Sequence, residues 1–96
     1  MEIEQILKER REDILRIASK HGAENIRIFG STLRGDRRPE SDLDLLVDVK
    51  PVHSSWFPAS FMVELESFLG LKVDIVTPDS IHWYIRDRIL KEARPL

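Results

Sequence analysis

The most informative segment of the sequence is Gly30-Ser31-Thr32-Leu33-Arg34-Gly35-Asp36-Arg37-Arg38-Pro39-Glu40-Ser41-Asp42-Leu43-Asp44-Leu45-Leu46-Val47-Asp48. It begins with a turn of small residues, continues through an arginine-rich connection and ends in a predicted strand, residues 42–49. Side chains two positions apart on a strand point to the same face, so Asp42 and Asp44 lie side by side. Adjacent carboxylates repel each other, and a fold that holds them together usually neutralises them with a cation. We therefore predict a metal site at the start of this strand and a hydrophobic back to it.

The composition limits the classes of protein to which the chain can belong. Its 96 residues fit one compact domain, residues 1–96. The net charge of −2 argues against direct binding of nucleic acid. The absence of cysteine excludes disulfides and thiolate metal sites, and it agrees with a reducing cytoplasm. No apolar run approaches the roughly 18 residues of a membrane span. We therefore expect a cytoplasmic protein that makes no use of a membrane.

The rest of the chain predicts a small α+β (mixed α/β) domain. Apolar residues recur at helical spacing in three segments and alternate in the strands between and before them. The predicted helices are residues 3–20, 59–69 and a last one after the turn at 77–80, with Asp79 or Ser80 as its N-cap. The predicted strands are residues 26–29, 42–49 and 71–76. This order predicts a small mixed sheet with helices on one face and the carboxylates on the other.

The turn after the first strand has the composition of an anion site. Glycine at Gly30 lets the backbone approach a ligand closely. If Ser31 begins a helical turn, its N–H groups and those that follow are available to a phosphate, and Arg34 would add a charge. An ordinary strand-ending turn is the alternative for a Gly-Ser pair. Arg37 and Arg38 are interpreted as residues of a solvated charged loop.

A third acid, Asp74, interrupts the apolar strand at residues 71–76. A buried carboxylate needs a partner, which a metal shared with Asp42 and Asp44 would supply, although an ordinary solvent-facing residue is the alternative. Three carboxylates without histidine or cysteine select Mg²⁺ or Mn²⁺ over zinc. Magnesium held in this way completes its shell with substrate phosphates. The pattern therefore predicts metal-assisted attack on a nucleoside triphosphate.

These motifs together resemble one known superfamily. Gly30-Ser31, Arg34-Gly35, Ser41-Asp42-Leu43-Asp44-Leu45 and Val73-Asp74-Ile75-Val76 are similar to the motifs of DNA polymerase β-like nucleotidyltransferases. Within that superfamily, the chain is most similar over nearly its whole length to the minimal nucleotidyltransferases, the MntA-like antitoxins. The resemblance implies a core like the polymerase β palm.

The resemblance also implies roles for the six site residues. Gly30, Ser31 and Arg34 would bind the triphosphate of ATP. Asp42 and Asp44 would hold the metal ions, and Asp74 would complete the metal site and activate the attacking hydroxyl.

A chain of this size is expected to lack a domain that holds the acceptor, so a macromolecule that docks would have to present the hydroxyl. The resemblance implies a type VII toxin–antitoxin system, in which AMP is transferred to a tyrosine of a HEPN-domain ribonuclease toxin. One alternative is a non-catalytic antitoxin that binds its toxin through Trp56, Phe57, Trp83 and Tyr84. Another is a transferase that acts on a small molecule.

Overall fold

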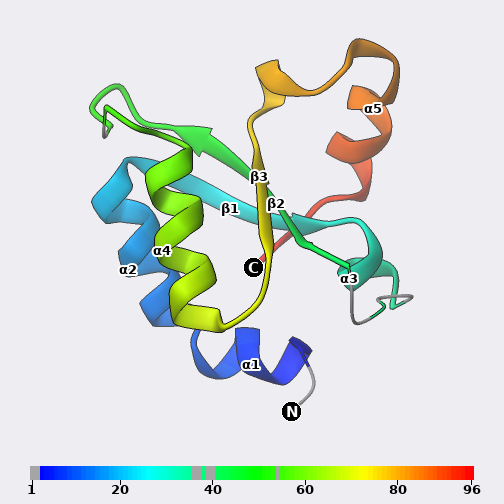
Figure 1. The fold of residues 1–96 in the computed structure, drawn as a ribbon. Coiled ribbons are helices and arrows are strands. Elements are labelled where there is room, and N and C mark those ends of the chain that lie inside the picture. The colour runs from blue at the N-terminus through cyan, green and yellow to red at the C-terminus, as the bar shows by residue number, and fades with distance from the viewer. Residues whose placement is uncertain (1–2, 36–37, 39–40, 54) are drawn as a thin grey trace.

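The computed structural model of the chain describes residues 3–35, 38, 41–53 and 55–96. Its helices are α1 (Ile3–Glu9), α2 (Arg11–His21), α3 (Ser31–Arg34), α4 (Ala59–Leu69) and α5 (Trp83–Glu92), with a 3-10 helix at Pro78–Ser80. Its strands are β1 (Ala23–Phe29), β2 (Leu43–Val49), β3 (Val73–Val76) and β4 (Arg94–Pro95). Figure 1 shows the strands crossing at the centre, with helices on both sides. Within the described ranges, none of the helices has the length and apolar composition needed to cross a bilayer.

The strands form one mixed sheet in the order β3-β2-β1-β4. β1 runs antiparallel to β2 and to β4, whereas β2 and β3 are parallel. The register pairs Phe29 of β1 with Asp44 of β2, and Asp44 with Asp74 of β3. The mixed sheet that the element order predicts is confirmed, and β2 is the strand that joins the predicted phosphate turn to the third acid.

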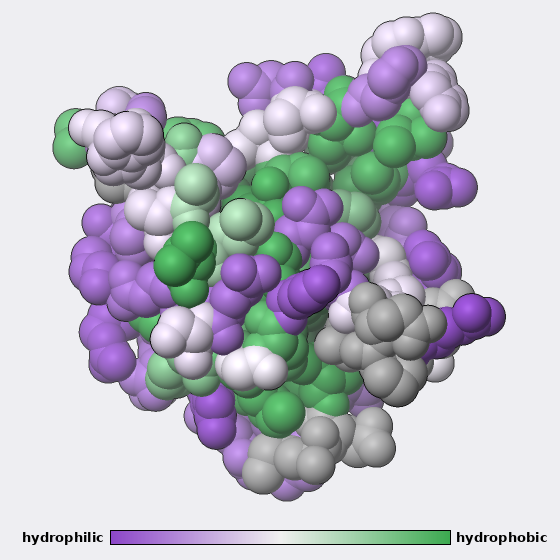
Figure 2. Space-filling model, in the orientation of Figure 1, coloured by the Kyte–Doolittle hydropathy of each residue, from purple (hydrophilic) through white to green (hydrophobic). Residues whose placement is uncertain are grey.

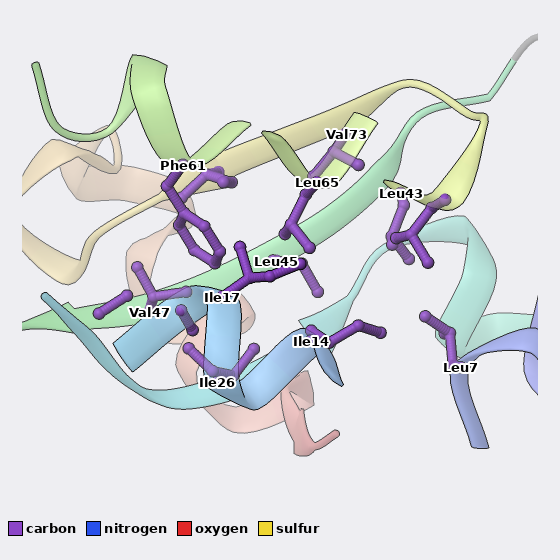
Figure 3. Close-up of a cluster of buried hydrophobic side chains, with 14 residues drawn as sticks. Leu7, Ile14, Ile17, Ile26, Leu43, Leu45, Val47, Phe61, Leu65 and Val73 are labelled. Carbon is purple, nitrogen blue, oxygen red and sulfur yellow. The ribbon is translucent and has the colours of Figure 1, made fainter. Parts of the chain in front are cut away.

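One face of the sheet is closed by α2 and α4 (Figure 1). Leu43, Leu45 and Val47 of β2 point to this face and are at most 1% exposed. Figure 3 shows these three side chains among residues of both helices, namely Ile14, Ile17, Phe61 and Leu65. Burial of each such side chain contributes roughly 1.5–3 kcal/mol before packing and entropy are considered. The predicted hydrophobic back of the strand is therefore the main core.

Helix α5 lies against the opposite face, where we expected no helix. Leu46 of β2 is fully buried there, in a second apolar cluster with Ile89 and Ala93. The periodicity of α5 predicts that it packs on an apolar surface but does not say on which one. The consecutive buried residues Leu45, Leu46 and Val47 are the signal that β2 is covered on both faces.

The predicted bounds hold where a glycine follows a helix. Gly22 and Gly70 follow α2 and α4, and α4 spans the predicted residues. The helix predicted over residues 3–20 is instead two helices, because the backbone at Arg10 leaves helical geometry (φ −105°, ψ 11°). The periodicity continues across this break, since the Arg10 N–H still donates to the Ile6 carbonyl (3.0 Å).

The C-terminal elements depart further from the prediction. Helix α5 begins at Trp83, because Thr77 and Ser80 close a separate 3-10 turn. The Thr77 N–H donates to Ser80 Oγ, and the Ser80 hydroxyl donates to the Thr77 carbonyl, both at 2.9 Å. Strand β4 was not predicted, since its two residues carry no alternating pattern and are placed by pairing with β1.

The arginine-rich connection lies mostly outside the described residues. Of residues 36–41, only Arg38 and Ser41 are described. The Ser41 N–H donates to the Arg38 carbonyl (2.9 Å), and the Arg38 N–H donates to Ser41 Oγ (3.1 Å). Arg38 is exposed, as expected for a solvated loop, and the interpretation of Arg37 falls outside the described ranges.

Candidate active site

The turn between β1 and α3 has the backbone that an anion site needs. Gly30 follows β1 and has φ 79° and ψ −154°, backbone angles that are strained for every residue except glycine. The first bond of α3 runs from the Arg34 N–H to the Gly30 carbonyl (3.1 Å). The N–H groups of Ser31 and of the two residues after it precede this bond and have no acceptor within the helix. The predicted helical turn at Ser31 is therefore confirmed.

The same turn touches the acid strand. A Cβ atom added to Gly30 would overlap Oδ2 of Asp44 and lie 3.1 Å from its Cγ. The β1–β2 register explains this closeness, because Phe29, the residue before the glycine, pairs with Asp44. Glycine is thus required here twice, by the backbone angles and by the carboxylate. The predicted phosphate turn and the predicted metal-binding acid are one local structure.

The three predicted acids lie at one end of the sheet. Asp44 and Asp74 are direct partners in the parallel β2–β3 register, and strands in such a pair lie about 4.8 Å apart. Asp44 is half-buried and Asp74 is exposed. Asp42 is exposed and comes immediately before β2, two residues ahead of Asp44. The sequence prediction that Asp74 comes beside the acid pair agrees with this register.

The donor chemistry of these acids suits a hard divalent cation. Carboxylate oxygens are the ligands that Mg²⁺ prefers, and two neighbouring carboxylates repel each other without a cation between them. Among residues 3–35, 38, 41–53 and 55–96, no group of three or more acids, histidines or cysteines is gathered closely enough to hold a metal. Asp42 and Asp74 are exposed, so rotation of their side chains would bring their oxygens toward Asp44. The residues therefore fit the ion in type and strand position.

Arg34, the predicted phosphate ligand, contacts the last helix. Its Nη1 lies 2.9 Å from Oε1 of Glu92 in α5, and half of its side chain is exposed. The pair connects the end of the predicted phosphate turn to α5, the helix on the face of the sheet that holds Asp44. Glu92 was not a predicted site residue, because it lies 58 positions along the chain from Arg34 and belongs to no motif.

The four aromatic residues predicted as interface anchors fall into different environments. Phe57 is half-buried, packs against the main core and stacks on Phe61 with ring centroids 6.3 Å apart. Its role is therefore in packing. Trp56, Trp83 and Tyr84 are exposed. Trp56 lies three residues before α4, a helix of the closed side, whereas the other two begin α5, the helix of the opposite side.

Known proteins resemble this chain in sequence over nearly its full length. A protein of Methanocaldococcus jannaschii named "Putative protein adenylyltransferase" is 39% identical over 87 residues, which are 91% of this chain and 94% of that protein. "Protein adenylyltransferase MntA" of Thermococcus cleftensis is 34% identical over 92 residues, which are 96% of this chain and 90% of that protein. The family described as "Nucleotidyltransferase domain" matches residues 1–96.

Solved structures agree with these matches. A structure described as a "putative minimal nucleotidyltransferase" superposes with a TM-score of 0.85 at 41% identity, covering 100% of this chain and 97% of the other. A toxin–antitoxin structure with AMP-PNP superposes with a TM-score of 0.71 at 20% identity, covering 88% of this chain and 69% of the other. The second likeness is one of fold alone.

Proposed function

Because the chain belongs to the nucleotidyltransferase domain family and is a nucleotidyltransferase, we propose that it transfers AMP from ATP to a hydroxyl of a partner protein. The observation that carries this proposal is the packing of Gly30 against Asp44, which joins a phosphate-binding turn to an acid pair. Relatives named protein adenylyltransferase support a protein as the acceptor. The toxin–antitoxin structure with AMP-PNP supports an adenine nucleotide as the donor.

In the proposed reaction, the acceptor's hydroxyl oxygen attacks the α-phosphorus of ATP. A new P–O bond forms, the bond to the oxygen that bridges the α- and β-phosphates breaks, and pyrophosphate leaves. Asp74 accepts the hydroxyl proton, and its exposed position on β3 leaves room for the acceptor. The N–H groups from Ser31 onward bind phosphate oxygens and orient the triphosphate for displacement.

Asp42, Asp44 and Asp74 would hold Mg²⁺, which when bound offsets the triphosphate charge and stabilises charge that develops at the α-phosphate. Mn²⁺ suits the same oxygen donors. Arg34, half-exposed at the end of the turn, would add a charge-assisted contact to a phosphate oxygen. We expect transfer to stop in the presence of a chelator and to return when Mg²⁺ is added in excess.

The proposed acceptor is a tyrosine of a HEPN-domain ribonuclease toxin, which would make the chain the antitoxin of a type VII toxin–antitoxin system. The likeness of fold to the toxin–antitoxin structure supports a toxin as the partner. ATP as the donor would place the reaction in the cytoplasm. A tyrosine suits the open site, because its hydroxyl stands at the end of a long, rigid side chain.

A second candidate function is neutralisation by binding alone, favoured by the exposed aromatic residues Trp83 and Tyr84. In that case the nucleotide would be structural or regulatory. Transfer to a small molecule is a third candidate, and no additional observation favours it.

Labelled ATP separates these candidates. The chain and the protein encoded beside it are incubated with Mg²⁺ and ATP labelled at the α-phosphate. We expect label on the partner, and we expect the double variant Asp42→Asn/Asp44→Asn to lower the transfer rate by at least about 100-fold, since loss even of an indirect metal contact costs 10–100-fold. Glu12→Gln, which removes an exposed acid on α2, is the control and should transfer normally.

Two outcomes contradict the enzymatic proposal. Neutralisation of the partner by the double variant, with no label on any protein, would leave binding alone as the function. Transfer of label from the γ-phosphate, but not from the α-phosphate, would indicate a kinase.

A further inference from the structure

Three aromatic rings are exposed together at the start of α5. Trp83 is 80% exposed and Tyr84 is 68% exposed, values that are unusual for side chains of this size. The ring centroids of His82 and Tyr84 lie 4.5 Å apart, edge to face, and those of Trp83 and Tyr84 lie 5.9 Å apart. Because the rings pack against one another, their side chains lose little conformational entropy when a partner covers them.

The outer side of α5 continues this surface along the helix. Trp83 and Leu90 are seven residues apart, so they lie on one stripe, and Leu90 is also exposed. Tyr84, Arg88 and Lys91 follow the spacing i, i+4, i+7 and form a second exposed stripe beside it. The inward residues of α5 pack on the sheet instead. The helix therefore presents an aromatic end followed by the cations Arg88 and Lys91 on one stripe, with the exposed acid Asp87 on the other.

This surface is on the side of the sheet that holds the acids. Asp44 and Leu46 alternate on β2 and point to one face, and α5 packs on Leu46. The last residue of α5, Glu92, contacts Arg34 at the end of the predicted phosphate turn, whereas the aromatic rings stand at the first residues of the helix, about 13.5 Å away along its axis. In Figure 2 the surface over α5, at the upper right, mixes pale and green atoms with purple ones. A protein that covers the whole outer face of α5 would thus extend from the aromatic rings to the end of the helix that contacts the predicted phosphate turn.

We propose that the outer face of α5, from Trp83 to Lys91, is the docking surface for the protein that accepts the nucleotide. The inference rests on the proposed function and adds the place of contact. The matching surface would have an apolar pocket for Trp83 and acidic side chains opposite Arg88 and Lys91, since complementary charges favour association and select the partner. Docking there would hold the acceptor hydroxyl near the site while it reacts.

The chain offers a matched control for this proposal. Trp56 is 76% exposed, nearly as much as Trp83, but in the chain it precedes α4, a helix that packs on the face of the sheet away from α5. Substitution of either tryptophan removes an exposed aromatic ring without opening the core. A difference in partner affinity between the two variants is therefore due to the position of the tryptophan and not to the loss of an exposed apolar ring.

The test measures binding separately from chemistry. Titration calorimetry in the inactive Asp42→Asn/Asp44→Asn background measures affinity for the protein encoded beside this chain. We expect Trp83→Ala/Tyr84→Ala to weaken binding by about 10- to 30-fold, as for interface hot spots, and Trp56→Ala to leave it unchanged. In the active background the aromatic double variant should bind ATP normally and transfer AMP slowly at low partner concentration. Arg88→Glu should slow association, most at low salt.

The outcomes distinguish this inference from the proposed function. If Trp83→Ala/Tyr84→Ala binds and transfers like the parent chain, the docking surface is wrong while the transfer reaction stands. If the partner binds through α5 but no AMP is transferred, the docking surface stands and the proposed reaction fails. If sedimentation shows that the aromatic pair joins two copies of this chain and partner binding is unaffected, the inference is overturned.

Discussion

The two faces of strand β2 differ in what covers them. Leu43, Leu45 and Val47 face α2 and α4 and are sealed from water over the length of the strand. On the opposite face, Leu46 is sealed by α5, but Asp44 lies half-buried beside the predicted phosphate turn at Gly30. On this strand the buried side chains, including Leu46, serve stability, and Asp44 is the residue proposed for chemistry. Substitutions on the closed face should change unfolding, and substitution of Asp44 on the opposite, open face should change transfer.

Leu45→Ala should have the largest effect, and it should be on stability. The side chain is 1% exposed in the main core, and such truncations cost about 2–5 kcal/mol of unfolding free energy. Urea denaturation measures this loss. Molecules that remain folded should transfer AMP at the parent rate. A fall in transfer with little change in stability would contradict the separation of the two faces.

Gly30→Ala should affect both properties, because this glycine is where the turn meets the open face. Its backbone angles make any side chain cost about 1–3 kcal/mol, and the added methyl group would displace the Asp44 carboxylate. Gly35→Ala is the matched control, since Gly35 also has positive φ (81°) but, among the described residues, no atom within 4 Å of an added Cβ. Equal transfer rates for the two folded variants would refute the role of the Gly30–Asp44 contact.

Glu92→Gln should have a smaller effect and should change ATP binding more than stability. The Arg34–Glu92 pair is partly exposed, and such pairs contribute at most about 1 kcal/mol. Removal of the Glu92 charge takes away one anionic competitor for the Arg34 guanidinium, so we expect the Kd for ATP to fall by less than about five-fold. Asp87→Asn, which removes an acid from the same helix, is the control. Titration calorimetry measures the Kd for ATP of both variants. Weaker ATP binding would mean that Glu92 positions Arg34 for the nucleotide.

Glu64→Gln should have the smallest effect, on the helices of the closed face. Hydrogen bonds from Lys20 and His21 lower the pKa of Glu64 below its ordinary value of 4.5. Its ionised form therefore stabilises the fold above pH 4.5, and this contribution is lost as the pH falls through the lowered pKa. The melting temperature should change less with pH between pH 3 and 6 in the variant than in the parent chain. Lys20, His21 and Glu64 belong to helices of the closed face, so the pH dependence of the transfer rate should not change. A change in that pH dependence would contradict this prediction.

Much of the site follows from local rules. The i, i+2 spacing of Asp42 and Asp44 predicts a shared face, and the glycine-serine turn predicts free N–H groups. The site's two further contacts were not predictable. Gly30 meets Asp44 because β1 and β2 pair in one register, and Arg34 meets Glu92 because α5 returns across the open face. No periodic sequence pattern indicates either contact, because the two partners are far apart along the chain.

Sequence patterns alone were enough for the strands β1, β2 and β3, the helices α2, α4 and α5, the hydrophobic back of β2 and the family. Each depends on spacings of a few residues, or on motifs that local geometry requires. The face on which α5 packs, the short strand β4 and the neighbours of Gly30 and Arg34 became visible only in three dimensions. They depend on which apolar surface was left uncovered and on strand register, and both are properties of the assembled chain.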